Sequence, residues 1–327
     1  MRWDIAAPVT LYLVYRSYSH GSLTPLGIVA AAVTATLHAL HPSPLPFTLL
    51  VTFFMLGTTA TKIKADVKAT LTMSSTGSHG RAPHASAIGF VFSGGWNKTK
   101  EYHEQKQRAA GKPGSGHVGP AGGQEPRSYS KGQDISFCPT SNRTKDLILL
   151  GIIANYAAVT ADTLSSELGI LSRSKPHFIL QPWTTVPPGT NGGVTFTGIL
   201  AGGAGAAVIG AVSALLLPAP GSGTLKDYLG LVLLTGGWGT LGSALDSILG
   251  ALLQASVIDR RSGKVVEASN GGRVLVLAKE ASTQQAKDKG NPSRAIGSGR
   301  DILDNNQVNF VMAATMTLGA IGLASVL

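Results

Sequence analysis

The sequence predicts an all-α membrane protein, a polytopic bundle of about seven transmembrane helices with a disordered polar loop. Only 13% of its 327 residues are charged, about half the share of a typical soluble domain. Two long stretches, 17–61 and 176–225, contain no Asp, Glu, Lys or Arg, and a spanning helix needs roughly 20 mostly apolar residues. The 41 glycines and few aromatic residues favour helices that approach closely through small side chains.

Seven apolar runs mark the expected helices in chain order. They lie at about 5–20, 23–40, 45–61, 146–163, 193–217, 228–254 and 308–327. Prolines at 42, 44 and 46, and again at 218 and 220, separate neighbouring runs. The first run is followed by no clear small-residue cleavage site, so we interpret it as a membrane helix in preference to a signal or transit peptide.

Two polar segments interrupt the single membrane domain, which we take to run from 1 to 327. The larger, 62–145, has a net charge of +8, and its centre, 75–140, is a low-complexity insert that we expect to be disordered. The smaller, 255–307, is a polar loop with a net charge of +3. If every later helix spans, these basic segments fall on opposite faces. Either the long loops escape the positive-inside rule or one element is broken or re-entrant, and 160–195 is the candidate.

Asp246 is the clearest candidate for a functional residue inside a helix. It lies in the apolar stretch "GSALDSILGA", with Gly242 and Gly250 four residues away on either side. A carboxylate in the hydrocarbon region costs roughly 2.5–3.5 kcal/mol, so it is kept mainly where it faces a cavity, a partner or an ion. The simpler alternative is a carboxyl group that hydrogen-bonds to a neighbouring helix and binds no ligand.

Asp162 and Glu167, in "ADTLSSELG", end a run that is uncharged from Leu147 to Ala161. They are five residues apart, about 140° around an ideal helix, so they converge only if the helix ends between them. Such a break would bring both carboxylates, with hydroxyls such as that of Ser165, into one polar mouth. In the alternative, Asp162 caps a helix and Glu167 faces water.

The stretch "VPPGTNGGV" opens the next apolar run. Glycines let backbone N–H groups approach an anion, and a helix N-terminus adds the positive end of a dipole, the arrangement that binds phosphate. The stretch lacks the Lys and the spacing of a Walker loop, and a plain turn uses the same residue types, so both interpretations stay open. The candidate residues are Gly189, Thr190, Asn191, Gly192 and Gly193.

Basic side chains near the helix ends are candidate partners for an anion. Lys62, Lys64 and Lys68 follow the third helix, and Arg143 precedes the fourth. The alternative for each is that it snorkels to the lipid headgroups.

Amides close the last polar loop in "LDNNQVNF". Asp304 and Asn305 are suited to cap the final helix, whereas Asn309, just inside it, calls for another role. The eight histidines show no metal-ligand spacing, and the single Cys138 excludes an internal disulfide.

In this order, and within hydrophobic segments, "ADTLSSELG", "VPPGTNGGV", "GSALDSILGA" and "LDNNQVNF" resemble the DUF92 family of integral membrane proteins. This family includes transmembrane protein 19 and the plant phytyl-phosphate kinase of tocopherol synthesis. The resemblance extends to "TKIKADVKATLT" at 61–72 and leaves out the insert at about 75–140. It departs from the family at "TLSS" and in a thinner Lys-rich stretch.

The resemblance implies a kinase that converts an isoprenoid monophosphate to the diphosphate with a nucleoside triphosphate, CTP being the expected donor. Phosphoryl transfer depends on metal-held phosphates, neutralised charge and alignment. Carboxylates suit Mg²⁺, so Asp162, Glu167 and Asp246 are the expected ligands. The stretch from Gly189 to Gly193 would hold the nucleotide. Asn191 would also be a catalytic residue, together with the three carboxylates. Phosphate contacts are expected from Lys62, Lys64, Lys68, Arg143, Ser165, Asn305 and Asn309.

Two other classes of protein fit some of these features. A secondary transporter or ion carrier also uses broken helices, intramembrane carboxylates and glycine-rich helix starts, although no convincing internal repeat is visible. A membrane scaffold explains the apolar runs but leaves three carboxylates without a role. We expect a multi-pass protein of an endomembrane or a plastid, in contact with membrane lipids and not with nucleic acid.

Overall fold

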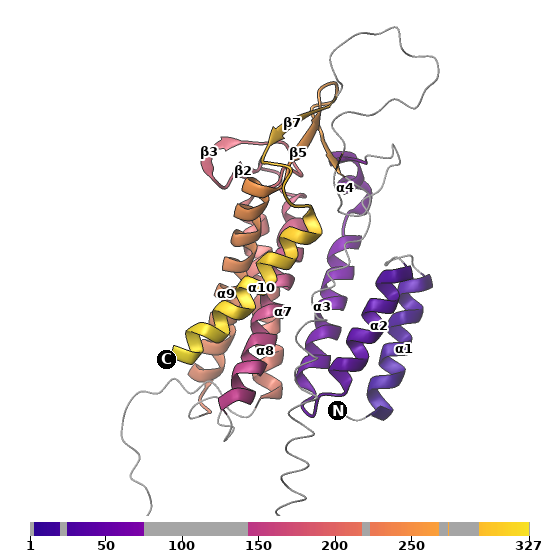
Figure 1. Cartoon of the computed structure of the whole chain (residues 1–327), viewed down its shortest axis with the longest axis vertical. Coiled ribbons are helices and arrows are strands. Elements are labelled where there is room, and N and C mark those ends of the chain that lie inside the picture. The colour runs from indigo at the N-terminus through magenta and orange to yellow at the C-terminus, as the bar shows by residue number, and fades with distance from the viewer. Residues whose placement is uncertain are drawn as a thin grey trace, which may run out of the picture.

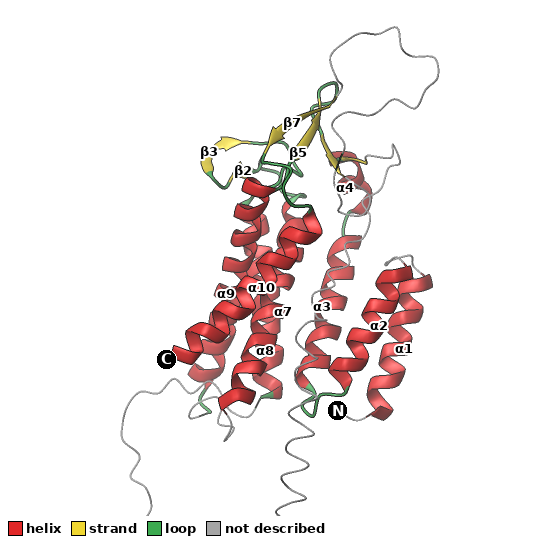
Figure 2. Ribbon diagram, in the orientation of Figure 1, coloured by secondary structure: helices red, strands yellow, loops and turns green. Residues whose placement is uncertain are grey.

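The computed structural model describes residues 3–19, 25–74, 143–217, 223–267, 274 and 294–326. Helices dominate this part of the chain and run roughly along one direction, with short strands gathered at one end (Figures 1 and 2). The predicted helical class is confirmed. The insert expected at 75–140 lies outside the described residues.

Each of the seven predicted apolar runs forms a helix, and a further short helix follows the third. Their bounds are α1 Trp3–Ser19, α2 Pro25–Ala39, α3 Leu45–Lys62, α4 Ala65–Leu71, α7 Arg143–Gly169, α8 Phe196–Leu216, α9 Leu225–Leu253 and α10 Asn305–Val326. Five of them are long and apolar enough to cross a membrane, namely α3, α7, α8, α9 and α10. The expected number of seven spans is therefore not confirmed, since α1 and α2 are shorter.

Helix α7 forms the centre of the bundle. It packs against α3, α8, α9 and α10, and its residues 151–161 are all buried. The main core joins Ile153 and Tyr156 of α7 to Leu49 of α3, Ile209 of α8 and Met312 of α10. Helices α1 and α2 stand beside α3 (Figure 1) and share a smaller cluster around Phe47.

The helix starts follow from local capping. Thr195 accepts a hydrogen bond from the Gly198 amide at 3.1 Å at the start of α8. At the start of α10, the backbone N–H of Gln307 donates to Asp304 Oδ1 at 2.9 Å. The backbone N–H of Asp304 donates in turn to Gln307 Oε1, also at 2.9 Å. The cap predicted for Asp304 is therefore present, and the same exchange is typical of a capping box.

Two small sheets cover the end of the bundle where α7 and α9 finish. The first has the strand order β1 (Met73–Ser74), β6 (Val265–Glu267), β5 (Ser256–Asp259) and β7 (Arg294–Ser298), with β1 parallel to β6 and the other pairs antiparallel. The second has the order β3 (Gln181–Thr185), β2 (His177–Phe178) and β4 (Gly193–Val194). These strands were not predicted from the sequence.

The broken or re-entrant element expected at 160–195 is absent from the described residues. Helix α7 continues without a break to Gly169, and the chain then forms the second sheet before α8 begins. The polar residues of this stretch up to Glu167 therefore belong to α7, and those after Gly169 belong to a loop with short strands and turns that satisfy its backbone groups.

Candidate functional site

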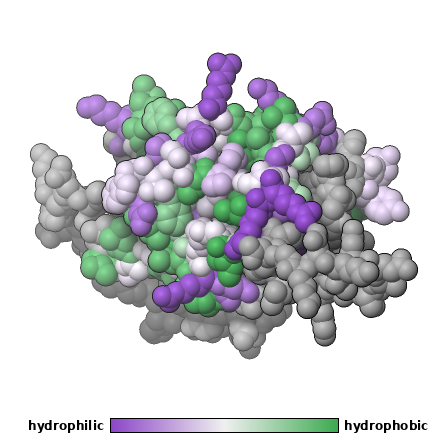
Figure 3. All heavy atoms as spheres, turned by 90° about the horizontal axis from the view of Figure 1, so that it is seen from above, coloured by the Kyte–Doolittle hydropathy of each residue, from purple (hydrophilic) through white to green (hydrophobic). Residues whose placement is uncertain are grey.

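A cavity of about 190 Å³ opens at the end of the bundle that carries the sheets. Its walls come from the last turns of α7 and α9, the loop before α8, strands β5 and β6, and the start of α10. In Figure 3, which views the molecule from above, hydrophilic side chains project from this end with apolar side chains between them. Nine predicted site residues line the cavity: Asp162, Ser165, Gly189, Thr190, Asn191, Gly192, Gly193, Asp246 and Asn305.

Asp162 and Asp246 meet across the cavity from two different helices. Their carboxyl groups lie within hydrogen-bonding range of each other. Asp162 lies seven residues before the end of α7, and Asp246 lies seven residues before the end of α9. Both are therefore about 10 Å from the helix ends along the helix axis. Two carboxyl groups this close require a shared proton or a cation between them.

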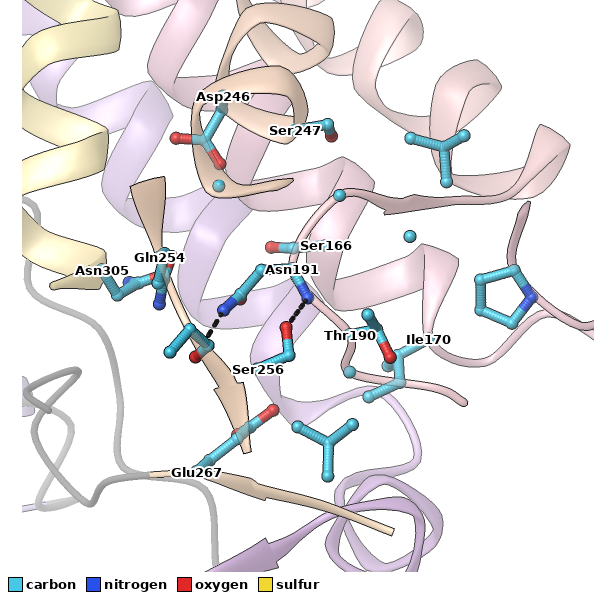
Figure 4. A pocket seen from close by; sticks show the side chains of 18 of the residues that line it. Ser166, Ile170, Thr190, Asn191, Asp246, Ser247, Gln254, Ser256, Glu267 and Asn305 are labelled. Atoms are coloured by element: carbon cyan, nitrogen blue, oxygen red, sulfur yellow. Dashed lines mark hydrogen bonds between the residues drawn. The ribbon is translucent and has the colours of Figure 1, made fainter. Parts of the chain in front are cut away.

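Asn309 supports Asp246 from α10. With its amide nitrogen turned toward the carboxylate, Asn309 donates to Asp246 Oδ1 at 3.0 Å and to the Asn305 carbonyl at 3.1 Å. Figure 4 shows Asp246 and Ser247 of α9 beside the same space as Asn191 and Asn305. Asn309 thus acts on Asp246, whereas Asn305 lines the cavity itself.

Glu167 is separate from the other two carboxylates. It forms an ion pair with Lys68, with 2.7 Å between Glu167 Oε2 and Lys68 Nζ and side chains only 5% and 3% exposed. Because α7 does not end between Asp162 and Glu167, the two point to different sides of the helix, as the angle of about 140° requires. The predicted grouping of the three carboxylates is therefore wrong for Glu167, and only Asp162 and Asp246 lie together. Among the described residues, no three His, Cys, Asp or Glu side chains are placed to hold one ion.

The glycine-containing loop is a turn whose amides bond largely within the protein. The backbone N–H of Thr190 donates to the Pro187 carbonyl, and that of Gly193 donates to the Thr190 carbonyl. The backbone N–H of Asn191 donates to Ser256 Oγ, and the three distances are 2.9–3.2 Å. Gly192 has a φ of 79°, and a Cβ there would meet Ala251 of α9 at 2.5 Å. The glycine therefore allows close packing on α9, and these three amides do not form the predicted phosphate cradle.

The remaining predicted basic residues lie elsewhere. Lys62 and Lys64 are exposed at the end of α3 and do not line the cavity. Lys68 is buried with Glu167, where it serves the fold. Arg143 begins α7, 19 residues before Asp162, so about 28 Å of helix separates it from the carboxylate pair. The phosphate contact expected of Arg143 is therefore corrected.

Several lining residues were not among the candidate site residues taken from the sequence. They are Ser166, Ser247, Gln254, Ser256, Glu267 and Asp301. Ser247 follows Asp246 directly, and Asp301 shortly precedes the last helix, so proximity to predicted residues was a usable signal for these two. Glu267 reaches the cavity because β6 pairs with β5, and no pattern in its neighbourhood indicated that pairing.

The cavity is strongly acidic. Its described lining residues include no Lys or Arg, and five of them carry carboxyl groups, namely Asp162, Asp246, Glu267, Asp301 and Asp304. An anion meets electrostatic repulsion there unless cations accompany it.

Comparison with known proteins places the chain in a family. Residues 8–317 match the family model for integral membrane protein DUF92. The chain is 37% identical over 164 residues to Protein PGR of Arabidopsis thaliana. The aligned residues make up 49% of this chain and 49% of the relative. It is 38% identical over 130 residues to the uncharacterized membrane protein MJ0933 of Methanocaldococcus jannaschii, covering 39% of this chain and 50% of the relative.

The matched regions span about half the length of both relatives. No solved structure matches the chain. Because the family model extends over nearly all of the 327 residues, this protein belongs to the DUF92 family of integral membrane proteins.

Proposed function

We propose that this protein is a membrane-embedded kinase that phosphorylates an isoprenoid monophosphate to the diphosphate. The acceptor would be of the phytyl or geranylgeranyl type, and the donor a nucleoside triphosphate such as CTP, used with Mg²⁺. The observation that carries the proposal is the facing pair Asp162 and Asp246 in an acidic cavity at one end of a membrane bundle.

The donor groups at the pair fit Mg²⁺. This ion is usually held by one or two carboxylates together with phosphate oxygens and water, and two carboxyl groups in mutual contact supply that number. When bound, Mg²⁺ neutralises phosphate charge and aligns the reacting groups. An anionic nucleotide would then enter an acidic cavity as its metal complex.

The residues around the pair have supporting tasks in this proposal. Asn309 holds Asp246 by a hydrogen bond of 3.0 Å, which fixes the direction of its carboxylate. Asn191 donates from Nδ2 to the Ala255 carbonyl at 3.2 Å, so its amide oxygen is directed away from that carbonyl. The hydroxyls of Ser165, Ser166 and Ser247 line the same cavity and offer donors to phosphate oxygens.

The acceptor needs no general base, because a monophosphate is already a nucleophile at neutral pH. A depth of about 10 Å below the helix ends suits a substrate with a charged head and a hydrocarbon tail. We expect the tail to leave the cavity toward the lipid-facing side of the bundle. The small residues of 198–210 in α8 and 239–250 in α9, which the sequence suggested for the tail, are already in close contact with neighbouring helices.

The position of the carboxylates favours a kinase over a secondary transporter. A transporter keeps its site near the bilayer midplane, with access from both faces in turn. Here no charged residue lies between Asp146 and Asp162 in α7, or between Asp227 and Asp246 in α9. These uncharged stretches leave no acidic path along α7 or α9 from the pair to the opposite face, which a transporter would need.

The test uses purified protein in detergent with Mg²⁺, phytyl or geranylgeranyl phosphate, and each nucleoside triphosphate in turn, with prenyl diphosphate measured by mass spectrometry. We expect Asp246→Asn and Asp162→Asn each to lower the rate by about 100-fold or more, the scale for losing one preorganised electrostatic group. Asp66→Asn, an exposed carboxylate on α4, is the matched control and should keep full activity. Folded protein that forms no diphosphate with any donor would rule out the kinase and make ion-coupled transport the next assay.

A further inference from the structure

The hairpin of β2 and β3 exposes apolar side chains beside the candidate site. Every residue of β3 is exposed, and the side chain of Trp183 in this strand is 81% exposed. Leu180, in the turn just before β3, is 40% exposed. Strand β3 is the edge of its sheet, and in Figure 1 it projects sideways past the ends of the helices. A single exposed apolar side chain is common, but a continuous exposed apolar surface marks a site of interaction with a partner or a membrane.

The apolar surface of the hairpin continues onto a membrane-facing helix. Strand β4 pairs with β2 and leads directly into α8, one of the helices able to span the bilayer. Phe196 at the start of α8 is 73% exposed, and Leu200, one turn deeper, is 56% exposed. The hairpin therefore adjoins the lipid-facing side of α8 at the level where that helix begins.

The surrounding side chains suit the headgroup layer of a bilayer. Arg173 and Lys175, just before β2, are exposed and can meet lipid phosphates. Tryptophan is enriched at membrane interfaces, because its ring is apolar while its N–H seeks a polar partner. An exposed Trp with neighbouring basic residues thus fits lipid better than open water.

The hairpin is also bonded to the loop that lines the cavity. The Ile179 amide donates to the Gly192 carbonyl at 2.8 Å, and the Val186 amide to the Pro176 carbonyl at 2.9 Å. His177 Nδ1 lies 2.7 Å from the Pro182 carbonyl within the hairpin. The position of Trp183 is therefore coupled to that of the loop from Gly189 to Gly193.

We propose that the hairpin 177–185 is an interfacial anchor, with Trp183 and Leu180 inserted into the lipid headgroup layer. The anchor keeps the loop over the cavity at the membrane surface, where an amphiphile presents its polar head. This inference concerns depth in the membrane and does not depend on the reaction catalysed.

Depth-dependent fluorescence quenching tests the anchor. The chain has four tryptophans, so Trp3→Phe, Trp96→Phe and Trp238→Phe together leave Trp183 as the sole emitter. The protein is placed in nanodiscs that hold one copy each. We expect lipids with a quencher near the headgroup to quench the fluorescence of Trp183 more than lipids with a quencher at the end of the acyl chain. Iodide in the aqueous phase should quench it little. The control adds Trp183→Phe and Arg261→Trp, which puts the emitter in the turn after β5. We expect iodide to quench this control and labelled lipids to leave it unchanged.

A second measurement covers the case in which the single-tryptophan variant does not fold. A spin label is attached to Trp183→Cys in a Cys138→Ser background, and the other three tryptophans are kept. The label reports how readily oxygen and a water-soluble nickel complex reach this position. Oxygen access above nickel access supports the anchor. Strong iodide quenching of Trp183 with none from labelled lipids, or nickel access equal to that of a label at Arg261→Cys, would overturn it.

Discussion

Lys68 and Glu167 show how one residue pair fixes the corner between α3 and α4. Lys68 Nζ donates to Glu167 Oε2 at 2.7 Å and to the carbonyls of Ala60 and Thr61 at 2.6 and 3.3 Å. Those carbonyls belong to the last turn of α3, where a lysine commonly completes the hydrogen bonding. Lys64 has a left-handed φ of 48°, so the chain turns sharply here and brings Lys68 back onto α3.

Replacing Lys68 should destabilise the protein, because Glu167 would keep a buried charge without this partner. We expect Lys68→Met to lower the free energy of unfolding by about 3–5 kcal/mol and to lower the midpoint of thermal unfolding in detergent accordingly. The double variant Lys68→Met with Glu167→Leu should recover much of the loss. Lys62→Met, at an exposed position on α3, should change stability by about 0.5 kcal/mol or less. Equal losses in the two single variants would contradict this account.

His41, in the connection between α2 and α3, predicts a pH dependence of stability. Burial lowers the pKa of His41 to about 4, and its Nδ1 accepts a hydrogen bond from the Ser43 amide at 3.0 Å. The unfolded chain, with a histidine pKa of about 6.5, binds more protons than the folded protein between these values. Stability is therefore full above pH of about 6.5 and falls as the pH drops toward 4.

Thermal unfolding measured across this pH range checks the sign. His41→Gln should flatten the decline, since the substituted residue does not titrate. His177→Gln, at an exposed position in the hairpin, should keep the slope of the native protein. An unchanged slope in His41→Gln would assign the pH dependence to other groups.

At the scale of elements, glycines set the distance between α7 and its neighbours. A Cβ on Gly239 of α9 would touch Ala206 and lie 2.7 Å from the Ala157 carbonyl oxygen of α7. Gly202 of α8 has the same relation to the Ala161 carbonyl at 2.8 Å. Close approach through small residues is the main way membrane helices gain packing contacts, so these positions fix the bundle that holds Asp162 beside Asp246.

Two glycines of α9 allow a matched test of this packing. Gly239→Ala should destabilise the bundle by about 1–3 kcal/mol through overpacking. Gly237→Ala adds a methyl with nothing within 4 Å and should be neutral or stabilising by up to about 1 kcal/mol. Thermal unfolding of both variants in one detergent measures the difference. Similar values for the two would mean that α7 and α9 are not in close contact.

Hydrophobic runs predicted the helices well, because five of the seven runs are long enough to match the thickness of the hydrocarbon core. Their ends were less predictable, and α7 continues to Gly169 past the polar residues from Asp162 onward. Local sequence could not show that this polar turn lines a cavity instead of ending a helix. The small sheets escaped because strands of two to five residues carry little periodicity.

The site was predictable where chemistry alone singled out a residue. Asp246 and Asp162 were found because carboxylates are rare in apolar runs, and the structure brings them together. Glu167 was placed wrongly with them, since its partner Lys68 lies 99 residues away in the chain. No local pattern shows that a carboxylate is already paired, and the same limit applied to the amides of the glycine-containing loop.

At the scale of the whole molecule, the charge near the helix ends predicts an orientation. Among the described residues, the end with the cavity carries Lys62, Lys64, Arg173, Lys175 and Arg300 close to the helices. Arg143, Lys145 and Lys226 lie near the other end. Basic residues near helix ends favour the cytoplasmic side. The cavity should therefore open to the compartment that holds nucleotides.

Cysteine labelling measures this orientation in bacterial spheroplasts. In a Cys138→Ser background, we expect a membrane-impermeant maleimide to label Lys226→Cys in intact cells and Arg261→Cys only after lysis. The two positions flank α9, which spans Leu225–Leu253, so they must differ in access if this helix crosses the bilayer. Labelling of both positions in intact cells would show that α9 does not cross. Labelling of Arg261→Cys alone would show that it crosses with the cavity facing outward, where cytoplasmic nucleotides could not serve as donors.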